Sequence, residues 1–145
     1  MKQALPQSIL FVCQLNSVRS PMAEGLMRAA FPNVGDVRSC GLYVGDVNDF
    51  MVTVMREKSI DMSDHEPSAL ADFQDMKFDH VIAFTKDTYD AVKTVFEDAP
   101  NTTTELWPVV DPGEGSLDVR AMLNNYRAIR DNIDARLRRT FIEAE

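Results

Sequence analysis

The chain has 145 residues, of which 45% are hydrophobic and 26% charged, with a formal net charge of −8, and this fits one globular domain over residues 1–145. The acidic balance argues against a nucleic-acid partner, because its phosphate backbone would be repelled by the protein surface. The sequence has two cysteines, Cys13 and Cys40, no long apolar run and no signal-like N-terminus, so we expect a cytoplasmic protein with no membrane partner and no disulfide scaffold.

The first predicted strand is the apolar segment 9–12 (ILFV), which ends beside Cys13. A short polar loop follows. Beyond it, apolar residues recur at the spacing of a helix face, at Ala23, Leu26, Met27 and Ala30. Ser20 suits the N-cap of this helix, and Pro21 suits its first helical position, because the missing proline N–H would have no intrahelical partner there. The segment therefore predicts a strand, a loop and a helix.

Five residues separate Cys13 from Arg19, and a loop of this length that enters a helix can point successive backbone N–H groups at one centre. A phosphate-like dianion would sit there, and the planar guanidinium of Arg19 could donate two parallel hydrogen bonds to it. The same positive field favours the thiolate form of Cys13 and makes it a nucleophile. We predict that a bound anion is held by Gln14, Leu15, Asn16, Ser17, Val18 and Ser20.

The later segments alternate between strand and helix patterns. Strands are predicted at 36–41, 78–85 and 105–107, and helices at 48–58, at 86–96 and from Asp118 onward. In the last helix, we expect the arginines between the apolar positions to form a solvated face. This alternation predicts an α/β fold, a three-layer α/β/α sandwich around a four-stranded parallel sheet. The first and last of its loops leave the carboxyl ends of strands, where open α/β sheets bind ligands.

The first loop resembles that of a known family, the low-molecular-weight protein tyrosine phosphatases, which share their fold with thioredoxin-coupled arsenate reductases. The matching residues are FVC at 11–13, Asn16, RSP at 19–21 and AE at 23–24. The resemblance implies the phosphotyrosine protein phosphatase I-like fold, with spatial strand order 2-1-3-4. It also implies hydrolysis of a phosphomonoester, most simply phosphotyrosine in a protein, through a cysteinyl-phosphate intermediate.

The resemblance assigns further roles by position. Asp111, in an Asp-Pro pair, would protonate the leaving group and then activate water. Asn16 and Ser39 would hold the loop in shape by hydrogen bonds, and His65 would brace it. Tyr43 or Phe50 could stack on a substrate ring. Neither a metal ion nor an organic cofactor is implied.

The sequence departs from the family at three places. Leu15 stands where the loop usually has glycine, and Val18 stands where a second cysteine is usual. Gly113-Glu114-Gly115 follows the Asp-Pro pair, where the phosphatases often have aromatic residues. Cys40 lies at a position that is usually small and buried, so we expect it to pack in the core, and we assign no site role to His80.

Two other functions remain open. A single-cysteine arsenate reductase would bind arsenate at Cys13 and use an external thiol, whereas an internal disulfide cascade is excluded because residues 78–100 contain no cysteine. A non-catalytic binder of oxyanions or phosphoproteins would be explained by Leu15. The expected partner is a phosphorylated protein or a small phosphomonoester, with arsenate in the first alternative.

Overall fold

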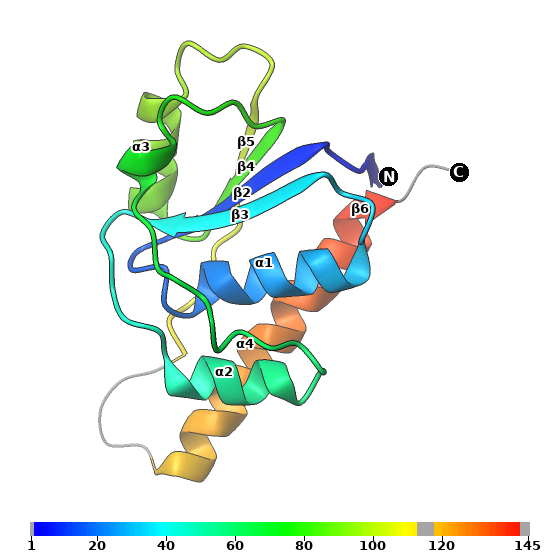
Figure 1. Ribbon diagram of the computed structural model, residues 1–145, viewed down its shortest axis with the longest axis vertical. Coiled ribbons are helices and arrows are strands. Elements are labelled where there is room, and N and C mark those ends of the chain that lie inside the picture. The colour runs from blue at the N-terminus through cyan, green and yellow to red at the C-terminus, as the bar shows by residue number, and fades with distance from the viewer. Residues whose placement is uncertain (1, 113–117, 143–145) are drawn as a thin grey trace.

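The computed structural model of the chain describes residues 2–112 and 118–142. Its central sheet has four parallel strands, β2 (Ser8–Cys13), β3 (Asp36–Gly41), β4 (His80–Ala83) and β5 (Thr103–Leu106). The helices are α1 (Arg19–Ala30), α2 (Asp49–Arg56), α3 (Lys86–Val95) and α4 (Val119–Thr140), with a 3-10 turn η1 (Leu70–Phe73) (Figure 1). In the described part, no helix has the length and apolar character needed to cross a bilayer.

The strand order of the central sheet is β3-β2-β4-β5. The chain also has a second, two-stranded sheet, β1 (Gln3–Ala4) with β6 (Phe141–Ile142), which the sequence did not predict. When the strands are numbered along the whole chain, the spatial order in this sheet is therefore 3-2-4-5 rather than the expected 2-1-3-4. The numbers differ because β1, which lies outside this sheet, takes the first number. Strands of two residues are too short to show an alternating pattern. The strand that ends at Cys13 lies between β3 and β4.

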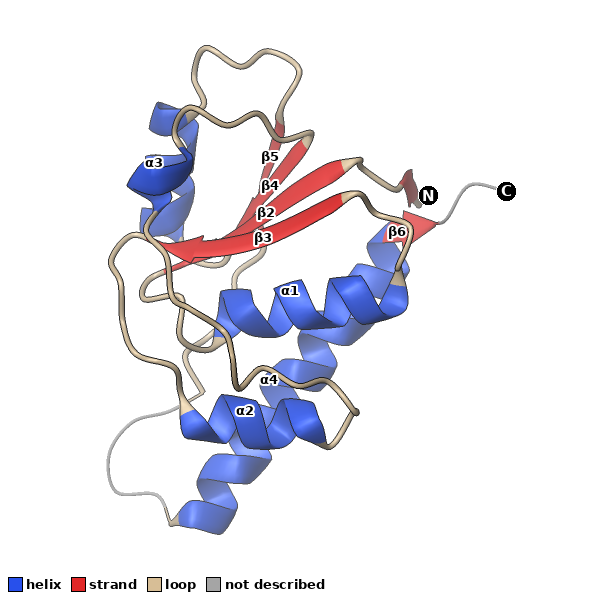
Figure 2. Cartoon of the chain, in the orientation of Figure 1, coloured by secondary structure: helices blue, strands red, loops and turns tan. Residues whose placement is uncertain are grey.

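Successive side chains of β2 enter two different hydrophobic clusters. Ile9, Phe11 and Cys13 join a cluster with residues of α1, α2 and α4. Leu10 and Val12 join the other cluster, with residues of η1 and α3. Because side chains alternate between the faces of a strand, these clusters lie on opposite faces of the sheet. Figure 2 shows α1, α2 and α4 on one side of the strands and α3 on the other.

The prediction for the start of α1 was wrong by two residues. The helix begins at Arg19 with Val18 as its N-cap, so Ser20 lies inside the helix and Pro21 is its third residue. The hydroxyl of Ser20 bonds to other groups and caps nothing. Pro21 is still tolerated, because none of the first four N–H groups of a helix has an intrahelical acceptor.

The arginines of α4 were expected on a solvated face, and this prediction fails at Arg130. Its side chain is buried and donates to the carbonyl of Val54 and to Glu57, both at 2.8 Å. Glu57 also accepts hydrogen bonds from Arg127, the shortest at 2.7 Å. These bonds connect the end of α2 to the middle of α4. The spacing of α4 alone could not show that a neighbouring helix offers a carboxylate at this point.

Acid should weaken this connection between α2 and α4. Hydrogen bonds from Arg127 and Arg130 lower the pKa of Glu57 from 4.5 to about 2. A carboxyl group with a lowered folded-state pKa adds stability that is complete above pH 4.5 and is lost as the pH falls through about 2. We expect Glu57→Gln to lower the free energy of unfolding by about 1 kcal/mol at neutral pH, the upper range for exposed ion pairs. Urea unfolding of the wild type and the variant, at neutral pH and in acid, measures this loss of stability.

The exposed Glu97→Gln is the control, because it removes one carboxylate that makes no hydrogen bond in the described part of the chain. The destabilisation by Glu57→Gln should shrink between pH 4.5 and pH 2. A destabilisation of the same size across this range would refute the role of the Glu57 charge.

Candidate active site

The loop at 14–18 connects β2 to α1 and turns its backbone carbonyls toward the segment 42–45. The carbonyls of Cys13, Gln14 and Leu15 accept hydrogen bonds from the N–H groups of Leu42, Tyr43 and Gly45, at 2.9–3.0 Å. Across a trans peptide the C=O and the next N–H point in opposite directions. The N–H groups of residues 14, 15 and 16 therefore point away from this segment. Within the described residues, no N–H from 14 to 18 donates to a protein acceptor.

The strained backbone position of this loop is Asn16, not Leu15. Asn16 has a φ of 56°, whereas Leu15 is not among the described non-glycine residues with positive φ. Asparagine tolerates the left-handed region better than most residues do. The leucine at the usual glycine position thus needs no forbidden conformation.

Asn16 is completely buried, and every polar atom of its amide has a partner. Its Nδ2 donates to the hydroxyls of Ser20 and Ser39, both at 2.9 Å, and its Oδ1 accepts from the N–H of Ser68 at 2.9 Å. His65 donates from Nε2 to the carbonyl of Asn16 at 3.1 Å. The structure therefore places Ser39 and His65 in contact with Asn16, which belongs to the loop.

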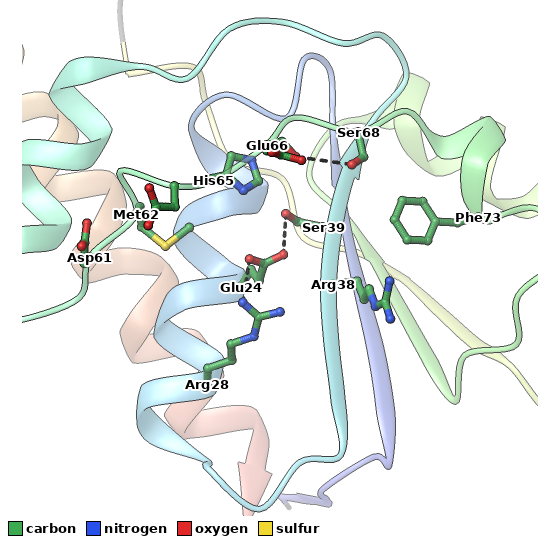
Figure 3. Close-up of a pocket in the computed structure, with 11 residues that line it drawn as sticks. Glu24, Arg28, Arg38, Ser39, Asp61, Met62, His65, Glu66, Ser68 and Phe73 are labelled. Atoms are coloured by element: carbon green, nitrogen blue, oxygen red, sulfur yellow. Dashed lines mark hydrogen bonds and ion pairs between the residues drawn. The ribbon is translucent and has the colours of Figure 1, made fainter.

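The network continues to a residue that sequence reasoning gave no role. Ser39 donates to Oε1 of Glu24 at 2.9 Å, and Arg28 donates to the other oxygen of this carboxylate at 3.0 Å. Figure 3 shows the carboxylate of Glu24 bonded to the hydroxyl of Ser39, with His65 nearby, and all three residues line a cavity of about 340 Å³. Glu24 lies four residues after Ser20, so the two share a helix face. That spacing was the signal that could have found Glu24.

The thiol of Cys13 is buried beneath the loop and contacts Ser20. Its Sγ lies 2.9 Å from the Ser20 hydroxyl, which is also 3.2 Å from the carbonyl of Cys40. The hydroxyl oxygen accepts a hydrogen bond from Asn16, so its single proton can go to the sulfur or to that carbonyl. Ser20 can therefore donate to a thiolate.

Cys40 lies in the core, as predicted. In the sheet register it pairs with Val12, while Cys13 pairs with Gly41, and the two cysteines belong to different hydrophobic clusters. Both thiols are free. Burial raises the pKa of Cys40. Its side chain lies on the opposite sheet face from Cys13, away from the loop.

The three predicted catalytic residues line one cavity of about 580 Å³. Cys13 and Arg19 come from the two ends of the loop, and Asp111 comes from the segment after β5. Arg19 donates from Nη1 to the carbonyl of Val109 at 3.0 Å, which ties the loop to the segment that carries Asp111. Its other N–H groups have no protein acceptor among the residues described.

Four further residues of this cavity were not predicted, Asp46, Val47, Asn48 and Tyr126. Asn48 caps α2 through its Oδ1 and donates from Nδ2 to the Tyr126 hydroxyl at 3.1 Å. Burial raises the pKa of Tyr126, the hydrogen bond from Asn48 opposes this, and the charge of Asp111 adds to it. The sequence placed Tyr126 in the apolar stripe of the last helix, and the only available signal was that a buried tyrosine hydroxyl needs a partner.

The other residues considered in the sequence analysis do not line this cavity. Tyr43 is 67% exposed and Phe50 packs on the ring of Tyr126, and neither lines the cavity. His80 is buried and pairs with Glu105. The stretch Gly113-Glu114-Gly115 lies outside the described residues. The described residues contain no group of three or more His, Cys, Asp or Glu side chains that could hold a metal ion.

Comparison with known proteins gives consistent matches along the chain. The sequence model of the family described as low molecular weight phosphotyrosine protein phosphatase matches residues 8–144. A protein-arginine-phosphatase of Geobacillus stearothermophilus is 31% identical over 142 residues, 90% of each chain. A glutaredoxin arsenate reductase of Synechocystis sp. is 28% identical over 136 residues, 90% of this chain and 93% of the relative. The solved structure of the YwlE arginine phosphatase from Geobacillus stearothermophilus superposes with a TM-score of 0.73 at 28% identity, covering 91% of this chain and 88% of that one.

Proposed function

This chain belongs to the low molecular weight phosphotyrosine protein phosphatase family, and from this premise we propose that Cys13, Arg19 and Asp111 hydrolyse phosphomonoesters through a cysteinyl-phosphate intermediate. The observation that carries the proposal is their convergence on one cavity, next to a loop whose backbone N–H groups have no acceptor in the described part of the protein. A backbone N–H group that has no acceptor in the protein needs a ligand or water as its partner. A tetrahedral dianion satisfies several such groups at once.

The first step transfers the phosphoryl group to the enzyme. The Cys13 thiolate attacks phosphorus, an S–P bond forms, and the bond from phosphorus to the leaving oxygen breaks. The N–H groups of the loop and the guanidinium of Arg19 stabilise the charge on the equatorial oxygens. Asp111 donates a proton to the leaving oxygen, so that an alcohol or phenol departs.

The second step returns the enzyme to its starting state. Asp111, now a carboxylate, accepts a proton from a water molecule that attacks phosphorus. The S–P bond breaks, inorganic phosphate forms, and the thiolate leaves. The hydroxyl of Ser20, 2.9 Å from the sulfur, stabilises this thiolate. Asn16, Ser39 and His65 hold the loop in the shape that both steps need.

The proposed substrate is a phosphorylated side chain of a protein, with phosphotyrosine as the first candidate, and the proposed location is the cytoplasm. A second candidate is phosphoarginine, a phosphoramidate, in which the bond that breaks joins phosphorus to nitrogen and the proton from Asp111 goes to the leaving guanidine nitrogen. Two carboxylates, Asp46 and Asp111, line the cavity, and Tyr126 is the one aromatic residue of its described lining. A cationic guanidinium fits such a lining better than a bare aromatic ring does, and a relative of 31% identity is named a protein-arginine-phosphatase.

The purified enzyme should hydrolyse p-nitrophenyl phosphate without any added thiol substrate. We expect thiol-dependent reduction of arsenate by the same preparation to be slower, because the cavity of Cys13 also holds Asp111, the acid that phosphoester hydrolysis needs. Faster arsenate reduction would favour the reductase alternative. Phosphate binding without turnover at any pH would identify a non-catalytic oxyanion binder.

Parallel assays with phosphotyrosine and phosphoarginine peptides decide between the two candidate substrates.

A further inference from the structure

Tyr126 brings a buried hydroxyl group to the wall of the catalytic cavity. It lies on α4, is 3% exposed, and lines this cavity together with Cys13 and Asp111. The ring of Phe50, on α2, packs on its ring with the centroids 5.4 Å apart, where α2 lies beside α4 (Figure 1). The ring by itself would be an ordinary part of a hydrophobic core. What Tyr126 can do in the cavity therefore depends on the direction in which its hydroxyl donates.

The amide of Asn48 determines this direction. Its Oδ1 accepts a hydrogen bond from the N–H of Met51 at 3.0 Å and so caps α2. Its Nδ2 donates to the hydroxyl oxygen of Tyr126 at 3.1 Å. Because an amide NH2 group only donates, the proton of the tyrosine cannot go to Asn48. It must point to a different acceptor.

No acceptor for this proton exists among the residues that the structure describes. Asn48 and Tyr126 both line the cavity, so the bond between them lies at its wall. A buried polar group without a protein partner is normally satisfied by a ligand or by an ordered water. Burial and the charge of Asp111 raise the pKa of the phenol, so it stays protonated near that carboxylate. Tyr126 is therefore a donor with an open place for an acceptor beside the acid.

We infer that the Tyr126 hydroxyl holds the water molecule that hydrolyses the cysteinyl phosphate. The inference rests on the proposed function, which supplies the phosphorylated Cys13. The N–H groups of the loop and Arg19 are occupied by the equatorial oxygens of the phosphoryl group. Tyr126 belongs to a different part of the cavity wall, so it remains available to the attacking water.

The hydrogen bonds and protons of this step balance. The water gives one proton to Asp111, accepts a hydrogen bond from Tyr126 with one lone pair, and attacks phosphorus with the other. The S–P bond breaks, the thiolate of Cys13 leaves, and Tyr126 keeps its proton. Asn48 acts only through Tyr126, whose hydroxyl it turns toward the cavity, so Asn48 is a positioning residue.

Burst kinetics with p-nitrophenyl phosphate test this role, because they separate the two chemical steps. The burst of nitrophenolate reports phosphoryl transfer to Cys13, and the steady state that follows reports hydrolysis of the intermediate. Tyr126→Phe keeps the ring and removes the hydroxyl. It should slow the steady state about fivefold to tenfold, the contribution of one hydrogen bond, and leave the burst rate unchanged. As a result, kcat and KM should fall together while kcat/KM stays the same.

Tyr89→Phe is the matched control. It removes the hydroxyl of a tyrosine on α3, which packs against the hydrophobic cluster on the opposite face of the sheet from Cys13. This variant should change neither the burst nor the steady state.

Asn48→Asp tests the orientation of the hydroxyl. A carboxylate can still cap α2, but it offers an acceptor in place of the Nδ2 donor and draws the Tyr126 proton away from the cavity. The variant should slow the steady state as Tyr126→Phe does. Because both changes remove the same hydrogen bond to water, the double variant should be no slower than the slower single variant.

The outcomes for the enzyme and for Tyr126 can be told apart. Failure of the wild type to hydrolyse p-nitrophenyl phosphate would reject the proposed function itself. If the wild type hydrolyses this ester, an unchanged steady state in Tyr126→Phe, a burst slowed to the same extent, or an equal effect of Tyr89→Phe would overturn the role of Tyr126 alone. Losses that multiply in the double variant would overturn the orientation by Asn48.

Discussion

Cys13→Ser should abolish hydrolysis of p-nitrophenyl phosphate and still bind inorganic phosphate. The serine hydroxyl is a far weaker nucleophile than a thiolate, and loss of a nucleophile lowers kcat by about 10⁴-fold or more. The N–H groups of the loop and Arg19 remain in place, so the anion site is kept. Steady-state kinetics and calorimetric titration with phosphate measure the two properties on one preparation.

The control for this variant is Cys40→Ala, which removes the other thiol from the opposite face of the sheet. Because Cys40 is completely buried, this change lowers stability, but it should leave kcat close to that of the wild type. Turnover that survives in Cys13→Ser, or that disappears equally in Cys40→Ala at a temperature where both variants are folded, would contradict the assignment of the nucleophile.

Asp111→Asn should slow the enzyme most for substrates with poor leaving groups. An asparagine cannot give up a proton, so alkyl phosphates should lose about 10² to 10⁴ in kcat/KM, the usual contribution of a general acid. A nitrophenolate leaves readily without a proton, so the loss for p-nitrophenyl phosphate should be smaller. The measurement is a series of aryl and alkyl phosphates, with log kcat/KM plotted against the pKa of the leaving group.

Asp46→Asn provides the comparison, because Asp46 lines the same cavity and carries the same charge. It should shift all substrates by a similar factor and leave the slope of the plot unchanged. If Asp111→Asn behaves in this way too, Asp111 acts on the site only through its charge, and another group is the acid.

Single strands and helices of the fold could be predicted from the sequence. The strand at 36–41 is confirmed residue for residue as β3, and the helix predicted at 86–96 is confirmed as α3, which ends one residue earlier. These segments have clear periodicity and marked ends. The pair of β1 and β6 could not be found, because its strands hold two residues each and join opposite ends of the chain.

The residues of the site also separate into those that the sequence could predict and those that it could not. Cys13 and Arg19 are close in sequence, so their spacing alone predicted the loop that the structure shows. The contact between Asn48 and Tyr126 joins residues 78 apart, and it exists only because α2 packs on α4. The start of α1 was misplaced for a related reason, since Ser20 has the chemistry of an N-cap but its hydroxyl bonds to the sulfur and to a neighbouring strand.

A crystal structure of the enzyme grown with inorganic phosphate tests the central claim most directly. The account predicts a phosphate within hydrogen-bond distance of the N–H groups of residues 14–18, held by two nitrogens of Arg19, with the sulfur of Cys13 beneath it. A loop that stays empty at saturating phosphate, or N–H groups that turn away from a bound ion, would contradict it.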